Sequence, residues 1–116
     1  MTNTWTQSGI SQWAEKTFGT PDNPFSLIDR ANREFTELWE LTHYTNHYDN
    51  ETYNSLRDPE AVSKADVLEE IADVVVILSQ VAHLLGGDLQ DEIAKKMIKN
   101  VNRKWVITAN GQGQHV

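Results

Sequence analysis

Two pairs of acidic residues in this chain have the spacing that places two carboxylates side by side on one helix face. Glu34 and Glu37 form one pair, and Glu70 and Asp73 form the other. Residues three apart are neighbours on a helix surface, so each pair offers its oxygens in one direction. Four carboxylates at close range repel one another unless a hard cation lies between them, and Mg²⁺ or Mn²⁺ prefers such ligands. The sequence therefore predicts a divalent metal site built from these four residues.

Glu70 is the least ordinary of the four acids, because it falls inside an apolar helix face. Between Val67 and Leu85 the apolar residues recur at the spacing of one helix face, and Asp73 lies at the edge of that face. A carboxylate in such a face is costly to bury unless it is paired, protonated or bound to a metal. Glu69 points to the opposite, solvated flank. This position favours a functional role for Glu70.

A stripe of complementary polar residues follows near the end of the chain. Lys96, Asn100 and Arg103 recur at i, i+4 and i+7, which places them along one side of a helix. Cations beside carboxylate-held Mg²⁺ are typical of phosphoryl chemistry, where positioning and charge neutralisation supply most of the catalysis. Acid pairs and basic stripes also occur on ordinary solvated helix faces. The joint pattern, rather than any one piece, carries the prediction.

The elements that position these residues are predicted to be helices. Periodicity and capping residues indicate four helices, over about residues 8–18, 25–48, 64–85 and 88–105. Ser8 or Ser11 is expected to cap the first, Gly19 to end it, and Asp88 to cap the last. Residues 46–60 are expected to form a loop, with Pro59 opening a turn. No segment shows clean period-2 alternation, so the fold class expected is all-α, a four-helix bundle.

Bulk properties bound the class of protein. The 116 residues suit a single domain, 1–116, with a core over about 9–105 and a flexible tail over 106–116. The net charge of −7 argues against nucleic-acid partners. The chain has no cysteine and therefore no disulfides, and no apolar run predicts a membrane span or a secretory signal. We therefore expect a cytoplasmic protein without membrane or nucleic-acid partners.

Taken together, the segments resemble the MazG-like nucleoside triphosphate pyrophosphohydrolases of the all-α superfamily. Arg33-Glu34-Phe-Thr-Glu37 is similar to the family motif Glu-Glu-x-x-Glu, with Arg33 in place of the leading acid, and Glu70-Ile-Ala-Asp73 matches Glu-x-x-Asp. The stretch 96–105 is similar to the family's Lys, Asn and Arg segment. The resemblance covers about residues 9–105. The closing stretch 105–116 also resembles small phage and prophage members that act on dATP or dGTP.

The resemblance implies hydrolysis of an NTP or dNTP to the monophosphate and pyrophosphate. Glu34, Glu37, Glu70 and Asp73 would hold two or three Mg²⁺ or Mn²⁺ ions, which bridge the phosphates and activate a water. Glu37, or its neighbour Glu34, would accept that water's proton. The phosphates would be bound by Lys96, Asn100 and Arg103. Arg33 implies fewer ions, or recruitment of Glu40.

Weaker sequence features indicate which residues bind the nucleotide base and which oligomer the protein forms. Trp13, Phe18 and Trp39 are candidates to stack on the base, although each also suits ordinary core packing. Aliphatic residues beyond one stripe, such as Val75 and Ala82, indicate burial on a second side. Together with the resemblance they predict a homodimer or homotetramer.

Three alternatives remain open at this point. Arg33 would also suit a nucleotide- or metal-binding module without turnover. Within the same superfamily, a dUTPase or a phosphoribosyl-ATP pyrophosphohydrolase shares the acidic residues. A purely structural helical adaptor is the third reading, and it predicts that Glu70→Leu stabilises the fold and changes nothing else.

Overall fold

The computed structural model describes residues 5–43 and 63–116. The helices are α1 Gln7–Phe18, α2 Ser26–His43, α3 Lys64–Leu84 and α4 Leu89–Asn102, and the strands are β1 Trp105–Ala109 and β2 Gln112–His115. All four predicted helices are therefore present, and the expectation of a mainly helical fold is confirmed. Among the described residues no helix is both long enough and apolar enough to cross a membrane. The predicted loop 46–60, Pro59 and the end of the second helix near Tyr48 lie outside the described residues.

α1 begins at least two residues earlier than either predicted cap allows. The side chain of Thr6 accepts a hydrogen bond from the backbone N–H of Gly9 at 3.0 Å and caps the helix. The prediction of Ser8 or Ser11 as the cap is therefore wrong, and Ser11 is buried instead. The predicted end is confirmed, because Gly19 adopts a φ of 83° and donates its N–H to the carbonyl of Glu15.

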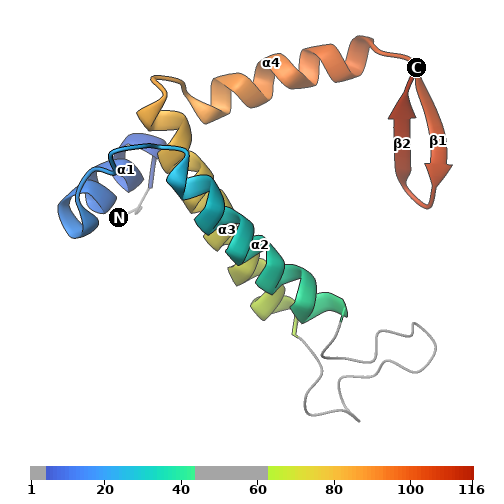
Figure 1. Ribbon diagram of the computed structural model, residues 1–116. Helices are drawn as coiled ribbons and strands as arrows, with labels where there is room; N and C mark the ends of the chain where they lie inside the picture. The colour runs from blue at the N-terminus through green and yellow to red at the C-terminus, as the bar shows by residue number, and fades with distance from the viewer. Residues whose placement is uncertain (1–4, 44–62) are drawn as a thin grey trace, which may run out of the picture.

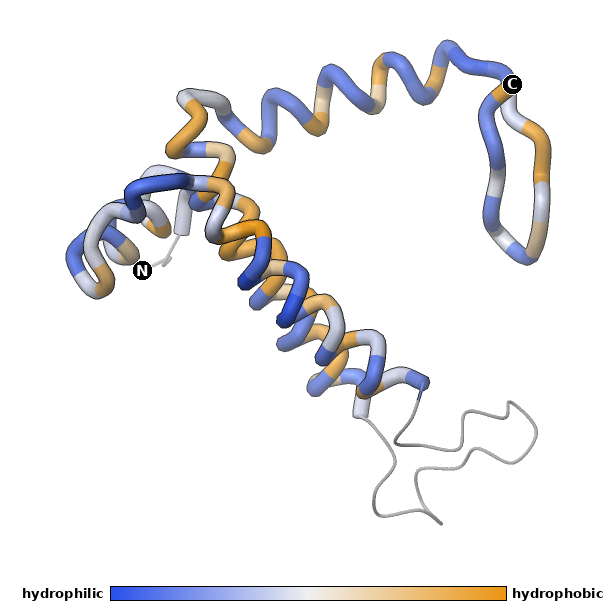
Figure 2. Tube along the Cα trace, viewed as in Figure 1, coloured by the Kyte–Doolittle hydropathy of each residue, from blue (hydrophilic) through white to orange (hydrophobic). Residues whose placement is uncertain are grey.

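α2 and α3 form a long antiparallel pair, and α1 crosses the C-terminal half of α3 (Figure 1). Figure 2 shows apolar and polar residues alternating along both long helices, as expected where only one face of each packs inward. The hydroxyl of Ser63 caps α3 by accepting from the N–H of Asp66 at 3.1 Å. The buried apolar side chains include Ala31 of α2 and Ile77 and Val81 of α3. The core of the chain therefore lies along α3.

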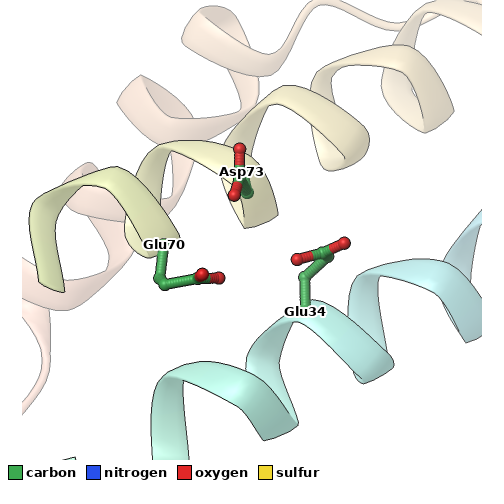
Figure 3. A group of neighbouring side chains, drawn as sticks. All are labelled: Glu34, Glu70 and Asp73. Atoms are coloured by element: carbon green, nitrogen blue, oxygen red, sulfur yellow. The ribbon is translucent and has the colours of Figure 1, made fainter. Parts of the chain in front are cut away.

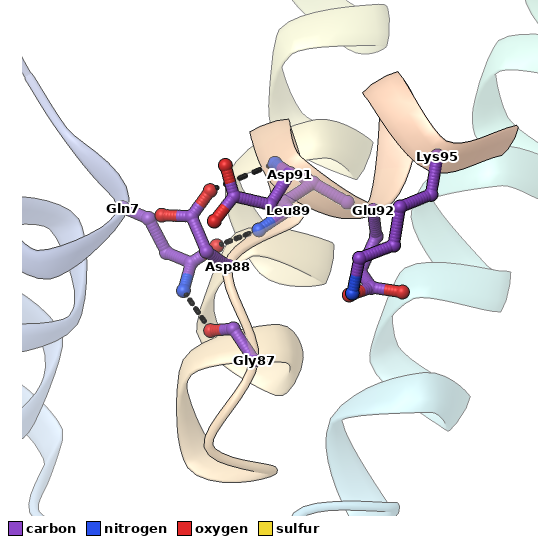
Figure 4. Close-up of polar contacts among 7 residues, drawn as sticks. All are labelled: Gln7, Gly87, Asp88, Leu89, Asp91, Glu92 and Lys95. Carbon is purple, nitrogen blue, oxygen red and sulfur yellow. Dashed lines mark hydrogen bonds and ion pairs between the residues drawn. The ribbon is translucent and has the colours of Figure 1, made fainter. Parts of the chain in front are cut away.

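The side chain of Gln7 in α1 holds the turn between α3 and α4. The amide of Gln7 donates to the carbonyl of Gly87 at 2.7 Å and accepts from the N–H of Leu89 at 2.6 Å (Figure 4). Gly86 adopts a φ of 78°, which favours glycine. Asp88 caps α4 as predicted, its carboxylate accepting from the N–H of Asp91 at 2.9 Å. These contacts fix where α4 starts.

α4 does not complete a four-helix bundle within the chain. It leaves α3 at the turn and runs away from the α2–α3 pair (Figure 1), and no side chain of Leu89–Asn102, all of which the structure describes, is buried. The helix also ends three residues before the predicted end near Trp105. The reason is local, because the backbone of Arg103 is extended and cannot continue the helix. The indole N–H of Trp105 donates a hydrogen bond at 2.7 Å to the carbonyl of Asn100, one of the last carbonyls of the helix.

The segment expected to be a tail without strands forms an antiparallel β-hairpin. β1 pairs with β2 in a register that places Trp105 opposite His115, with a bulge between Ile107 and Ala109. Asn110-Gly111 makes the turn, and Gly111 has a φ of 66°. The expectation of no strands is wrong because β2 consists of Gln, Gly and His, so no apolar alternation could reveal it.

Candidate metal centre

The packed faces of α2 and α3 each contain one carboxylate. Along α3 the less exposed positions recur at Val67, Glu70, Val74, Ile77 and Val81, the spacing of one helix face. Glu70 therefore lies in the face that packs, as predicted, beside Val74, Ile77 and Val81.

For α2 the sequence predicts a core stripe of Ile28, Ala31, Phe35 and Leu38, and the structure confirms Ala31 and Leu38 as members of the packed face. The less exposed positions are Leu27, Ala31, Glu34 and Leu38. Phe35 was expected in the core and is 52 % exposed, whereas Glu34 takes the inward position. The two helices thus turn Glu34 and Glu70 toward their shared interface.

Three of the four predicted ligands meet across this interface. Glu34, Glu70 and Asp73 each offer one oxygen, and these oxygens lie within 4.8 Å of one another (Figure 3). Two oxygens on opposite sides of one Mg²⁺ lie about 4.2 Å apart, given Mg–O distances of about 2.1 Å. Small side-chain adjustments would therefore close the group around one ion. Asp73 is exposed and opens the group to solvent.

One carboxylate oxygen of the acidic group, on Glu70, has no hydrogen-bond partner among the described residues. Its Oε2 atom is buried and receives no hydrogen bond from any described residue. Leaving a buried polar atom without a partner costs about 1–3 kcal/mol, and more for a charge. Burial is the largest cause that raises the pKa of Glu70, followed by the negative charges of Asp73, Glu37, Glu34 and Glu69. A proton or a cation would relieve this cost, so the donor set fits a divalent metal ion.

Glu37, the remaining predicted ligand, lies at the margin of the group. It is exposed, one turn beyond Glu34 on α2, and it is not among the three residues whose oxygens converge. Its charge nevertheless raises the pKa of Glu70, so it faces the same region. Arg33, in place of a leading acid, is exposed on α2.

Of the predicted phosphate-binding residues, Lys96 and Asn100 lie on α4 and Arg103 follows it directly, away from the acidic group. Lys96 is exposed, whereas Asn100 and Arg103 are half-buried at the end of the helix. There the carbonyl of Asn100 accepts from the indole of Trp105 and from the N–H of Arg103. Because α4 runs away from α2 and α3 (Figure 1), the chain by itself does not bring these residues to the carboxylates.

The predicted aromatic candidates have different surroundings. Trp13 and Phe18 of α1 form an edge-to-face pair with ring centroids 5.5 Å apart, and the guanidinium of Arg30 lies over the Phe18 ring at 5.8 Å. Trp39 stacks on His43 with centroids 4.4 Å apart. In both arrangements the aromatic rings contact side chains of α1 or α2 within the chain.

Trp13 also lines an apolar hollow beside α3 that the sequence did not reveal. The hollow has a volume of about 370 Å³ and is lined by Trp5, Ile10, Trp13 and Val76. Val76 follows Asp73 by one helical turn, so the hollow lies next to the acidic group along α3. The sequence feature that could have indicated this hollow is Trp5, an isolated aromatic residue in an otherwise polar N-terminal segment.

Comparisons with known proteins add one relative. A dATP/dGTP diphosphohydrolase of Salmonella phage PMBT28 is 31% identical to the chain over 111 residues, which is 95% of this chain. The aligned stretch is 30% of that relative, so the chain spans about a third of its length. No family model matches the chain, and no solved structure matches it.

Proposed function

We propose that this chain is a Mg²⁺- or Mn²⁺-dependent nucleoside triphosphate diphosphohydrolase that converts a (d)NTP and water to the (d)NMP and pyrophosphate. The observation that carries the proposal is the convergence of Glu34, Glu70 and Asp73 around a buried carboxylate oxygen that has no described partner. A cluster of this kind is costly for folding and is retained where it holds a cation. The relative named for dATP and dGTP supports purine deoxynucleotides as substrates.

In this proposal different residues of the chain bind the metal ions and accept the proton of the attacking water. Glu34, Glu70 and Asp73 would hold the first ion, and Glu37 would extend the site toward a second. When bound, the ions lower the pKa of a water and neutralise phosphate charge. Glu37 or Glu34 takes a proton from the water as its oxygen bonds to the α-phosphorus. The bond from the α-phosphorus to the bridging oxygen breaks, and pyrophosphate leaves.

The other predicted residues complete the substrate site. Lys96, Asn100 and Arg103 bind the phosphates, and Arg103 can donate two parallel hydrogen bonds to one phosphate. The hollow beside Asp73 supports Trp13 as a wall for the base, because a flat indole stacks on a purine. Phe18 and Trp39 are weaker candidates, since each already packs on a neighbouring side chain. We propose a homodimer or homotetramer as the active form.

The test is a substrate panel read for product identity. The protein is incubated with Mg²⁺ and with dATP, dGTP, dCTP, dTTP, dUTP, the ribonucleotides and phosphoribosyl-ATP. Release of pyrophosphate with a preference for dATP or dGTP is expected. Orthophosphate as the product would contradict the proposal. Tight nucleotide binding without turnover would favour the non-catalytic module that Arg33 suggests, and a preference for dUTP or phosphoribosyl-ATP would change the substrate class.

A further inference from the structure

The C-terminal hairpin is attached to the end of α4 through the side chain of Trp105. Its indole N–H donates a hydrogen bond at 2.7 Å to the carbonyl of Asn100. The same carbonyl accepts from the backbone N–H of Arg103 at 3.3 Å. Asn100 lies in the last turn of the helix, where carbonyls have no partner within the helix. Two donors that follow the helix therefore meet on one carbonyl at its end.

The second strand of the hairpin supports the Trp105 ring. His115 is the register partner of Trp105, and their rings pack edge to face with centroids 5.9 Å apart. A Cβ atom at Gly113 would lie 3.6 Å from Cε3 of Trp105, so the indole passes close to the backbone there. The N–H of Val116 donates to the carbonyl of Lys104 at 2.9 Å and closes the end of the hairpin beside Trp105. The second strand thus helps to set the position of the ring.

Arg103 lies between the end of α4 and Trp105, and its side chain has no partner. Its backbone is extended, with φ −87° and ψ 157°, and the residue is half-buried. Within residues 5–43 and 63–116 its guanidinium forms no ion pair or hydrogen bond. No Asp or Glu follows Glu92 in the sequence, so the hairpin brings it no acidic neighbour. A guanidinium in these surroundings is available to bind an anion.

We propose that Trp105 is a positioning residue of the phosphate-binding site. Through the carbonyl of Asn100 it fixes the bend of the chain that carries Arg103, and the hairpin supports it. The segment 106–116, which the sequence predicts as a flexible tail, then becomes a working part of the site. The inference rests on the proposed function for the phosphate contact of Arg103, but not for the position of Arg103 itself.

The expected effect of this positioning is on binding rather than on the chemical step. An extended residue after a helix end has no regular hydrogen-bond ladder to hold it, so a free Arg103 would have to be ordered when the phosphates bind. Fixing it beforehand removes that entropy cost. A contact to phosphates that is made equally in the bound substrate and in the transition state changes KM and leaves kcat nearly unchanged.

Trp105→Phe tests this effect, because it keeps an aromatic ring beside His115 and removes the indole N–H. With dGTP as the substrate, we expect KM to rise about fivefold, the factor that corresponds to one ordinary hydrogen bond, with little change in kcat. Asn102→Ala is the matched control. It removes a side-chain hydrogen bond of 2.8 Å to the carbonyl of Ile98 at the same helix end, and its KM should stay near wild type. An unchanged KM in Trp105→Phe would overturn the proposal.

A double-mutant cycle distinguishes positioning of Arg103 from a general loosening of the hairpin. Arg103→Ala should raise KM about tenfold or more, the factor of a hydrogen bond to a charged group. If Trp105 acts through Arg103, adding Trp105→Phe to Arg103→Ala changes KM by less than about twofold. Effects of the two substitutions that simply multiply would show that Trp105 acts elsewhere.

Nuclear magnetic resonance tests the position of Arg103 without requiring turnover. In Trp105→Phe the ¹⁵N order parameter of the Arg103 amide should fall from a rigid value toward the flexible range, below about 0.6, whereas Asn102→Ala should leave it unchanged. A protein that shows this loss but hydrolyses no nucleotide would retain the positioning and reject the proposed function. A protein that releases pyrophosphate while Trp105→Phe changes neither KM nor the order parameter would do the reverse.

Discussion

At the scale of single residues, Glu70 is the side chain on which the proposed chemistry depends. It lies in the packed face of α3, one of its oxygens is buried, and no described residue donates a hydrogen bond to it. Replacing a buried charge by a neutral group of the same shape removes a folding cost and also removes a ligand. Activity and stability should therefore respond in opposite directions.

Glu70→Gln is expected to lower kcat/KM by about 100-fold or more, as loss of a central charge-stabilising group does in other sites. In metal-free buffer the free energy of unfolding should not fall, because an amide costs less to bury than a carboxylate. Enzyme kinetics and urea unfolding measure the two effects. Glu69→Gln, at the exposed neighbouring position, is the control and should leave activity near wild type. A variant that is destabilised but fully active would contradict the metal role.

The raised pKa of Glu70 also predicts how stability depends on pH without metal. The charged groups around it are Asp73, Glu37, Glu34 and Glu69, all negative. A carboxyl with a raised pKa binds more protons in the folded than in the unfolded chain, between its ordinary value of 4.5 and its folded value. Stability should therefore fall as the pH rises through this window.

Urea unfolding of wild type and Glu70→Gln at increasing pH isolates this contribution. The wild type should lose stability relative to the variant as the pH rises from 4.5. Saturating Mg²⁺ should reverse the trend for the wild type, because a ligand that binds only the folded state stabilises it. A stability difference that does not change with pH would show that Glu70 is not held in this environment.

At the scale of elements, the sequence predicted helices well where periodicity and caps agree. Gly19 ends α1 and Asp88 caps α4 as expected. The long-range contact of Gln7 with the turn before α4 has no signature in the sequence, since its partners lie about eighty residues away. The Gln7 side chain thus connects the first helix to the start of the last.

Gln7→Ala should loosen this turn. We expect faster amide hydrogen exchange at Leu89 and a loss of about 1 kcal/mol in the free energy of unfolding, the usual worth of a hydrogen bond. Gln12→Ala is the matched control, because the Gln12 amide donates a hydrogen bond to Ser8 within α1. Unchanged exchange at Leu89 in Gln7→Ala would show that Gly86 and the Asp88 cap are sufficient to hold the turn.

At the scale of the whole molecule, the α2–α3 pair has two different sides. Viewed along each helix from its N-terminus, the exposed apolar residues lie on the same side of the packed face. Asp73 of α3 and Glu37 of α2 lie on the opposite side of that face. In an antiparallel pair this places each set on one side. The apolar side consists of Ile28, Phe35, Leu68, Ile71, Val75 and Leu78, all more than a third exposed. An apolar surface shared by two helices is typical of an interface.

We therefore expect the protein to sediment as a multiple of its 13.2 kDa monomer. Val75→Glu places a charge in the middle of the apolar side and should shift the protein toward the monomer, with a lower melting temperature. Analytical ultracentrifugation measures the mass. Thr17→Glu adds the same charge at an exposed position of α1 and should leave the mass unchanged. A Val75→Glu protein of unchanged mass would place the interface elsewhere.

The sequence by itself determined the helices, most of their boundaries and the candidate acidic residues, because periodicity, capping and i, i+3 spacing are local properties of a helix. The tertiary structure alone decided which oxygens converge, since Glu34 replaces Phe35 in the packed face of α2 and Glu37 lies at the margin. It also decided that α4 leaves the bundle and that residues 105–115 form a hairpin. Helix phase, turn direction and strand pairing depend on contacts between distant residues, and local periodicity does not encode such contacts.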